Sequence, residues 1–295
     1  VNSTGHADMI ELEDGRWYMV SLGKRNDLDG DANMGRETYL MPMQWEPTIV
    51  KWEQVSEDRW EPLRYLFPVV APLTGKVERF TPLPYADKPQ YINNTVVDDF
   101  LDENLDLRWT FVRVPEDKTY SLSENPGFLR LYSKPGIIQD RKRFSLVGFR
   151  QKESDFEFEV KMNFSPEKDK VESGIIHYQK EWNYLTNTVT KVKKKYYLEQ
   201  NLKEKSKEIV TLKKTILKGY DGNIILKVKS KKDKYDFYYS LNNGSSFIYF
   251  TSMDAIKILD RNYTGALLGL YTTSNGKVTQ DYADYDWIRY RDYLR

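Results

Sequence analysis

Apolar and polar residues alternate over short stretches of this chain, and most stretches end at Asn, Gly, Asp or Pro. Alternation with period two predicts β-strands, because successive strand side chains point to opposite faces. After residue 96 it predicts eleven strands, over 128–133, 144–149, 155–164, 173–190, 192–202, 208–217, 222–229, 234–241, 246–251, 265–272 and 284–291. Many short strands of this kind are typical of a β-sandwich. Only residues 254–259 suggest a short helical turn, so we predict an all-β protein.

The first fifty residues predict a smaller set of strands, over 8–12, 16–22 and 36–43. Asp14-Gly15 lies between the first two, and this dipeptide favours a tight hairpin turn. Three or four strands cannot close a barrel or a propeller, since unpaired edges would remain. Residues 1–50 therefore predict a fragment of a sheet domain that needs a further segment.

Proline is frequent between these two regions, and it excludes long regular elements because it lacks a backbone donor. We interpret residues 51–95 as a linker packed along the surface. The predicted domains are then 1–50, the linker 51–95, and a sandwich over 96–295.

The net charge of the chain gives little information about its partners. The 45 Lys and Arg nearly cancel the 44 Asp and Glu, so no overall field would attract nucleic acid or an anionic membrane. The Lys-rich stretch 191–218 alternates with period two, which favours a hairpin with a solvated face over a basic helix. No apolar run is long enough to suggest a membrane span, and we expect neither nucleic acid nor membrane as a partner.

The absence of cysteine excludes disulfides, thiolate metal sites and a cysteine nucleophile. It does not fix the compartment: we favour a cytoplasmic location, and secretion stays open because the chain starts at Val1 rather than Met. The 22 Tyr, 13 Phe and 7 Trp fit either sugar stacking or sandwich packing. Composition therefore leaves the function open.

Ordered motifs lie near both ends of the chain. The early ones are Ser3-Thr4-Gly5-His6-Ala7-Asp8, Gly15-Arg16-Trp17-Tyr18-Met19-Val20 and Asn33-Met34-Gly35-Arg36-Glu37-Thr38. The late ones are Tyr263-Thr264-Gly265-Ala266, Gly269-Leu270-Tyr271 and Tyr282-Ala283-Asp284-Tyr285-Asp286-Trp287. The early motifs look like the late propeller blades of a family 43 glycoside hydrolase, and the late ones resemble the C-terminal sandwich of that family's β-xylosidases. Asp98-Asp99-Phe100 and Leu107-Arg108-Trp109 look like the opening of that sandwich.

The resemblance implies part of a five-bladed β-propeller followed by a concanavalin-like β-sandwich, or jelly roll. It also implies an inverting hydrolase that releases xylose or arabinose from xylo- or arabino-oligosaccharides. Inversion needs one carboxylate as base and one carboxylic acid, roughly 6.5 to 9.5 Å apart. By the resemblance, acid and base lie upstream of this chain, so it would be inactive without an N-terminal propeller segment from the same gene or a second chain. The sequence leaves homo-oligomer formation open.

The resemblance also assigns roles to particular residues. His6 would lie under the active site beside a hydrated cation, where an imidazole orients water or a metal ion. Thr4 would allow the backbone to approach that centre, and Arg36 would point into the pocket to hold sugar hydroxyls or a catalytic carboxylate. Tyr263 would reach from the sandwich to wall the pocket, in a place where related enzymes often have Phe.

Metal sites are less strongly indicated. Asp98, Asp284 and Asp286 could supply oxygens to a structural calcium ion that links the first and last sandwich strands, although turn and edge chemistry explains them as well. The loop 27–31 lacks the downstream Glu of a calcium loop, and we interpret it as an ordinary polar loop. We expect no required cofactor, with calcium or another cation as the open alternative. A rival hypothesis is a non-catalytic carbohydrate-binding or scaffolding sandwich.

Overall fold

The computed structural model describes residues 1–25, 34–85, 95–141, 144–231, 233–260 and 263–293. Strands dominate these residues, and the helical elements among them are two short 3-10 turns, Ile138–Asp140 and Ala255–Lys257. The second turn lies inside the predicted stretch 254–259. None of the described helices is long and apolar enough to cross a membrane. The all-β prediction is confirmed.

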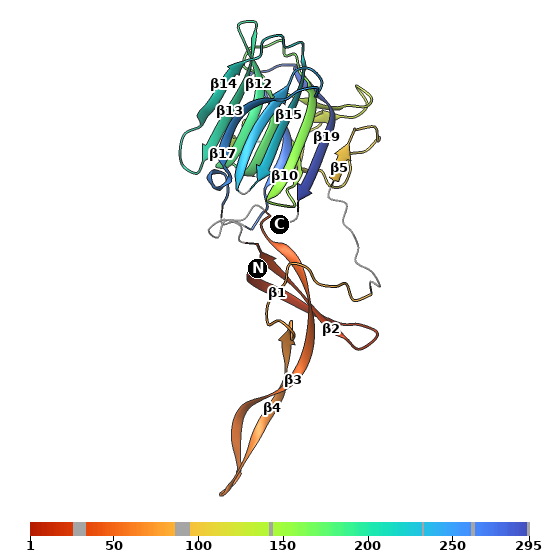
Figure 1. Ribbon diagram of the computed structural model, residues 1–295, viewed down its shortest axis with the longest axis vertical. Coiled ribbons are helices and arrows are strands. Elements are labelled where there is room, and N and C mark those ends of the chain that lie inside the picture. Colours follow the sequence, from red (N-terminus) through yellow and green to blue (C-terminus); the bar gives the residue numbers. More distant parts are fainter. Residues whose placement is uncertain (26–33, 86–94, 142–143, 232, 261–262, 294–295) are drawn as a thin grey trace. The chain divides into compact units, whose positions relative to one another are not determined.

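The chain divides into two compact units, the first comprising residues 1–26 and 36–91 and the second residues 27–35 and 92–295. The first unit is a four-stranded antiparallel sheet in the order β1-β2-β3-β4 (Figure 1). Its strands are β1 (Asn2–Glu11), β2 (Trp17–Lys24), β3 (Glu37–Ser56) and β4 (Arg59–Val70). Gly15 has a φ of 81° in the β1–β2 turn, a conformation that glycine adopts without strain.

The third and fourth strands form a long hairpin where the sequence predicted a linker. Their pairing runs from Met43 opposite Val70 to Ser56 opposite Arg59, so residues 51–70 are largely regular strand. The prolines do not prevent this, because β4 is an edge strand and β3 has no partner in β2 beyond Met43. Proline is tolerated where its missing N–H would face an open edge.

The second unit is built from two antiparallel sheets (Figure 1). In the eight-stranded sheet the order is β17-β16-β15-β10-β19-β8-β7, with β5 also paired to β19, and in the seven-stranded sheet it is β14-β13-β12-β11-β18-β9-β6. The strands are β5 (Thr95–Asp98), β6 (Thr110–Phe111), β7 (Tyr120–Ser121), β8 (Leu129–Tyr132), β9 (Ser145–Arg150), β10 (Asp155–Asn163), β11 (Glu172–Lys180), β12 (Asn183–Val192), β13 (Lys195–Glu204), β14 (Val210–Ile216), β15 (Asn223–Lys231), β16 (Lys234–Ser240), β17 (Ile248–Asp254), β18 (Leu267–Thr273) and β19 (Tyr282–Tyr293).

Alternate residues of the two sheets form one large apolar core. Phe156, Phe158 and Tyr290 are fully buried in it and contact one another or Phe149 through their rings. His177 belongs to this core, stacked on Tyr235 with ring centroids 4.8 Å apart. Burial lowers the pKa of His177 to about 3, so the imidazole is neutral and packs as part of the core.

The predicted sandwich strands agree with the structure except in two respects. The stretch 173–190 is two strands, β11 and β12, because the chain reverses at Glu181-Trp182, between two runs of buried residues. The strands β5, β6 and β7 were not predicted, since two to four residues are too few to show a period.

Candidate functional site

The first strand is irregular where Thr4 and His6 lie. Its pairing with β2 shifts between Asn2 and Gly5 and again between Gly5 and Asp8. His6 has a φ of 47°, a left-handed conformation that costs a non-glycine residue about 1 kcal/mol or more. Bulges of this kind re-aim side chains and are frequent beside active sites. The imidazole of His6 is exposed to solvent.

Thr4 lines a hollow in the first unit with a volume of about 260 Å³. Ser21 and Met41 also line it, and the buried Ser21 hydroxyl has no hydrogen-bond partner among the described atoms. His6 is not part of this lining, and neither is any described Asp or Glu. The hollow therefore contains no described pair of carboxylates for acid and base catalysis.

The acidic residues near these motifs are occupied or exposed. Asp14 accepts hydrogen bonds from the Arg16 guanidinium at 2.6 and 2.8 Å, which lower the pKa of its carboxyl. Asp8 and Glu11 lie exposed on β1. None of the three has the desolvated environment expected of a catalytic acid.

Arg36 lies at the entry to β3 and is partly buried. Its neighbour Glu37 is held by Arg25, which donates from two nitrogens to the two carboxylate oxygens at 2.7 Å each. The Tyr39 hydroxyl donates to the same carboxylate at 3.3 Å, and burial together with this negative charge raises the pKa of Tyr39 to about 12. Glu37 is thus neutralised by Arg25, a partner that the sequence did not indicate.

Tyr263 lies in the second unit, just before β18, with 64% of its surface exposed. Gly35, which precedes Arg36, packs against this segment so closely that a Cβ added there would lie 2.7 Å from the Tyr263 carbonyl oxygen. A Cβ on Gly265 would lie 2.5 Å from the Met34 carbonyl oxygen. Within the second unit, the structure therefore brings Met34-Gly35 into backbone contact with the motif 263–266.

The three aspartates considered for calcium have protein partners, and Asp286 pairs with Lys161 at 2.8 Å. Asp98 accepts a hydrogen bond from the Trp109 indole N–H at 2.7 Å. Asp284 accepts from Arg130 through both oxygens at 2.8 Å and from Asn125 at 2.9 Å. No group of three or more His, Cys, Asp or Glu that could hold a metal ion occurs among the described residues. Calcium between these strands stays a prediction, and the described contacts give it no support.

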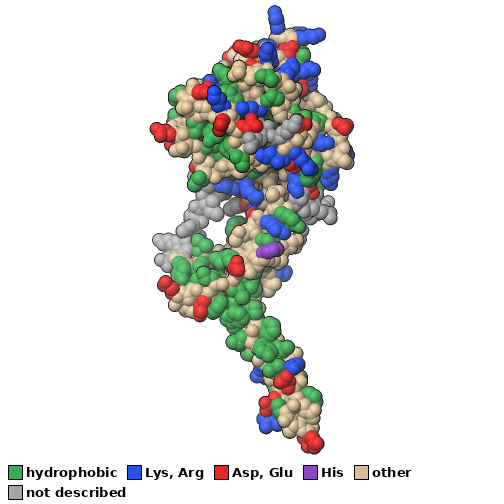
Figure 2. Space-filling view, turned by 180° about the vertical axis from the view of Figure 1, so that it is seen from behind, with side chains coloured by type: hydrophobic (Ala, Val, Ile, Leu, Met, Phe, Trp, Pro, Cys, Tyr) green, Lys and Arg blue, Asp and Glu red, His purple; other side chains and the backbone are tan. Residues whose placement is uncertain are grey.

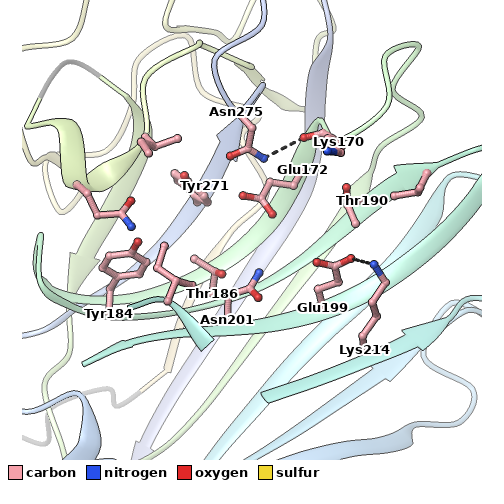
Figure 3. A pocket seen from close by; sticks show the side chains of 14 residues that line it. Lys170, Glu172, Tyr184, Thr186, Thr190, Glu199, Asn201, Lys214, Tyr271 and Asn275 are labelled. Atoms are coloured by element: carbon pink, nitrogen blue, oxygen red, sulfur yellow. Dashed lines mark hydrogen bonds and ion pairs between the residues drawn. The ribbon is translucent and has the colours of Figure 1, made fainter. Parts of the chain in front are cut away.

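A second hollow, which we call the outer-face hollow, lies on the side of the seven-stranded sheet that faces away from the core (Figure 3). It has a volume of about 350 Å³ and is lined by Glu172, Thr186, Thr190, Asn201, Tyr271 and nine further side chains. Burial raises the pKa of Glu172 to about 7. Sequence reasoning missed Glu172, because an outward-facing carboxylate on a strand has the same pattern as a solvated one.

Comparison with known proteins decides the family. The profile of the family 43 "Beta xylosidase C-terminal Concanavalin A-like domain" matches residues 97–291. The chain belongs to glycoside hydrolase family 43. The resemblance inferred from the sequence motifs is confirmed, and so is the concanavalin-like sandwich of the second unit.

Family 43 relatives cover almost the whole chain. It is 29% identical to the non-reducing end α-L-arabinofuranosidase BoGH43B of Bacteroides ovatus over 290 residues, which are 97% of this chain and 51% of the relative. It is 30% identical over 296 residues to a xylosidase/arabinosidase of Butyrivibrio fibrisolvens, covering 98% of this chain and 52% of the relative. The chain thus spans about half the length of the curated relatives it matches.

Solved family 43 structures agree with the fold. The Bacteroides ovatus xyloglucan-locus protein GH43B superposes with a TM-score of 0.83 at 26% identity, over 98% of this chain and 54% of that one. BlXynB of Bacillus licheniformis superposes with a TM-score of 0.78 at 28% identity, over 98% and 53%. Both matches fit a propeller followed by a sandwich, with the first unit as the propeller part.

Proposed function

We propose that this chain is the C-terminal part of an inverting glycoside hydrolase that releases xylose or arabinose from xylo- or arabino-oligosaccharides, and that it is inactive without the remaining propeller blades. The observation that carries the proposal is the incomplete chemistry of the first unit. It presents the His6 and Arg36 motifs of family 43, yet its hollow contains no described carboxylate pair. The remaining blades would supply acid and base, either from an upstream segment or from a second chain.

The surface of the first unit supports an additional segment. Large apolar side chains are exposed along its strands (Figure 2), among them Met9, Ile10, Ile49, Trp52, Trp60, Leu66 and Phe67. Exposed apolar areas of this kind mark contact surfaces, because leaving them in water is unfavourable. Packing of neighbouring blades would bury part of this area.

The residues have distinct roles in the completed enzyme. Arg36 donates paired hydrogen bonds to sugar hydroxyls or holds a catalytic carboxylate ionised, which a planar guanidinium does better than an ammonium. His6 orients a hydrated cation below the reacting sugar, and Thr4 permits close approach of the backbone. Tyr263 walls the pocket, so that one sugar is released at a time.

The stereochemistry of the product tests the proposal. The chain, reconstituted with the upstream propeller segment, is given xylotriose and arabinotriose, and the anomer formed first is followed by proton NMR. We expect a sugar of inverted configuration, and Arg36→Ala should lower kcat/KM about 10- to 100-fold through loss of charged hydrogen bonds. Control substitution Arg59→Ala, at the exposed end of the long hairpin, should leave the rate unchanged. A retained anomer would contradict the inverting mechanism.

A further inference from the structure

The outer-face hollow has a polar floor made by three neighbouring strands (Figure 3). Glu172 of β11 is paired with Thr190 of β12 in the sheet register. The next positions along β12 pair with β13, Thr188 with Glu199 and Thr186 with Asn201. Since paired residues share a face, carboxylate, hydroxyl and amide groups lie in adjacent rows on the side opposite the core.

An apolar cluster closes one end of this floor. Ile138, Leu146, Ile176 and Tyr178 pack there with Tyr184 and Tyr271, separately from the main core. Tyr184 and Tyr271 have only 4% and 3% of their surface exposed, yet both line the hollow. They form a wall rather than a stacking platform. The hollow is thus walled at one end and open to solvent elsewhere, and it is not a flat sheet face.

The charged side chains that line the hollow balance, since Lys170 and Lys214 lie there with Glu172 and Glu199. Glu199 is paired with Lys214 at 2.5 Å. Glu172 has no ion-pair partner among the described residues, and its Oε2 accepts one hydrogen bond, from the Thr188 hydroxyl at 3.0 Å. A hydrogen bond from the Asn275 side chain also lowers the pKa of this carboxyl. A carboxylate with two neutral protein donors still has acceptor capacity left for ligand hydroxyls or water. The Asn275 amide donates to the Lys170 carbonyl at 2.9 Å and borders the same space.

This chemistry narrows the class of ligand. Two lysines and two glutamates line the hollow, so its charges favour neither an anion nor a cation, and a polar floor does not suit an apolar ligand. The described residues offer two carboxylates but no third metal-ligating group. A neutral polyhydroxyl ligand fits best, because its hydroxyls both donate to carboxylates and accept from amides and threonines.

We propose that the outer-face hollow is a non-catalytic binding site for a neutral oligosaccharide of pentoses, whose hydroxyls donate to Glu172 and accept from Asn201. The volume of about 350 Å³ lies in the range of small-ligand cavities and suits one or two sugar rings. The choice of pentoses rests on the proposed function; the location of the site does not. Such a site would hold the substrate polymer without acting on it.

Titration calorimetry with the whole chain tests this proposal. Xylotriose, arabinotriose and cellotriose serve as probes, and the first two distinguish xylan-type from arabinan-type ligands. We expect saturable binding of at least one pentose trisaccharide, more than tenfold weaker in Glu172→Gln and in Asn201→Ala. Glu103→Gln, an exposed carboxylate outside the hollow, should bind within twofold of the unmodified chain.

Methyl NMR of the unmodified chain provides a readout that does not depend on the folding of the variants. The methyl signals of Thr186 and Thr190 should shift as the pentose probe saturates. Absence of saturable binding, or binding that is unchanged in both variants, would overturn the site. Equal or tighter binding of cellotriose would overturn the assignment to pentoses. Because calorimetry needs no hydrolysis, failure here is separable from failure of the enzymatic proposal.

Discussion

The buried carboxylate of Glu172 makes the stability of the second unit depend on pH in a calculable way. Its pKa is about 7 in the fold against 4.5 for an ordinary Glu. Between these values the folded state binds more protons than the unfolded state, so this residue lowers stability as pH rises from about 4.5 to 7. At about 1.36 kcal/mol per pH unit, the full effect is about 3 kcal/mol, and partial exposure reduces it to about 2 kcal/mol.

Replacing Glu172 by Gln removes this pH-dependent loss of stability while keeping an acceptor for the Thr188 hydroxyl. The variant should equal the unmodified chain at pH 4 and exceed it by about 2 kcal/mol at pH 8. Urea unfolding followed by circular dichroism at several pH values measures this difference. His177 titrates in the opposite sense, because its pKa is lowered to about 3, so only the difference between the two proteins isolates Glu172. A difference independent of pH would refute the burial of this carboxylate.

Three further predictions concern the second unit. Gly265→Ala should cost about 1–3 kcal/mol and increase hydrogen exchange around Met34, because the new methyl would lie 2.5 Å from the Met34 carbonyl oxygen; unchanged exchange would contradict the contact. Asp284→Ala should lower the unfolding free energy by about 2 kcal/mol, since the partly buried Arg130 loses two short charged hydrogen bonds and keeps only the longer contact to Glu124 at 3.4 Å. Asp286→Ala, which breaks a more exposed ion pair, should cost under about 1 kcal/mol, and equal losses would argue against this difference. Chelation with EDTA should leave the melting temperature of the sandwich unchanged, and a fall reversed by calcium would reveal a site.

Sequence patterns predicted the strands well where alternation extended over five or more residues. Most sandwich strands belong to this class, and the turn between the first two strands was predicted from its Asp14-Gly15 dipeptide. Prolines misled the prediction over 51–70, because a proline count carries no information on which strands have open edges. The open edge of β3 follows only from the strand pairing, because β3 continues beyond the end of β2.

The residues of the candidate site could be predicted only where they belong to a sequence motif. Contacts between residues distant in sequence were not predictable, because they depend on how chain segments pair and not on local pattern. Examples are the hydrogen bond from Trp109 to Asp98 and the ion pairs of Arg130 with Asp284 and of Arg25 with Glu37. Glu172 was missed for the same reason, since its burial depends on a cluster formed by residues elsewhere in the chain.

We propose that the first unit is one part of a sugar-hydrolysing propeller whose acid and base lie elsewhere. The decisive assay follows the release of nitrophenol from nitrophenyl β-xyloside and α-arabinofuranoside, by the purified chain alone and after reconstitution with the upstream segment. We expect no turnover by the chain alone and turnover of at least one substrate after reconstitution. Turnover by the chain alone, or a completed propeller without any, would contradict it.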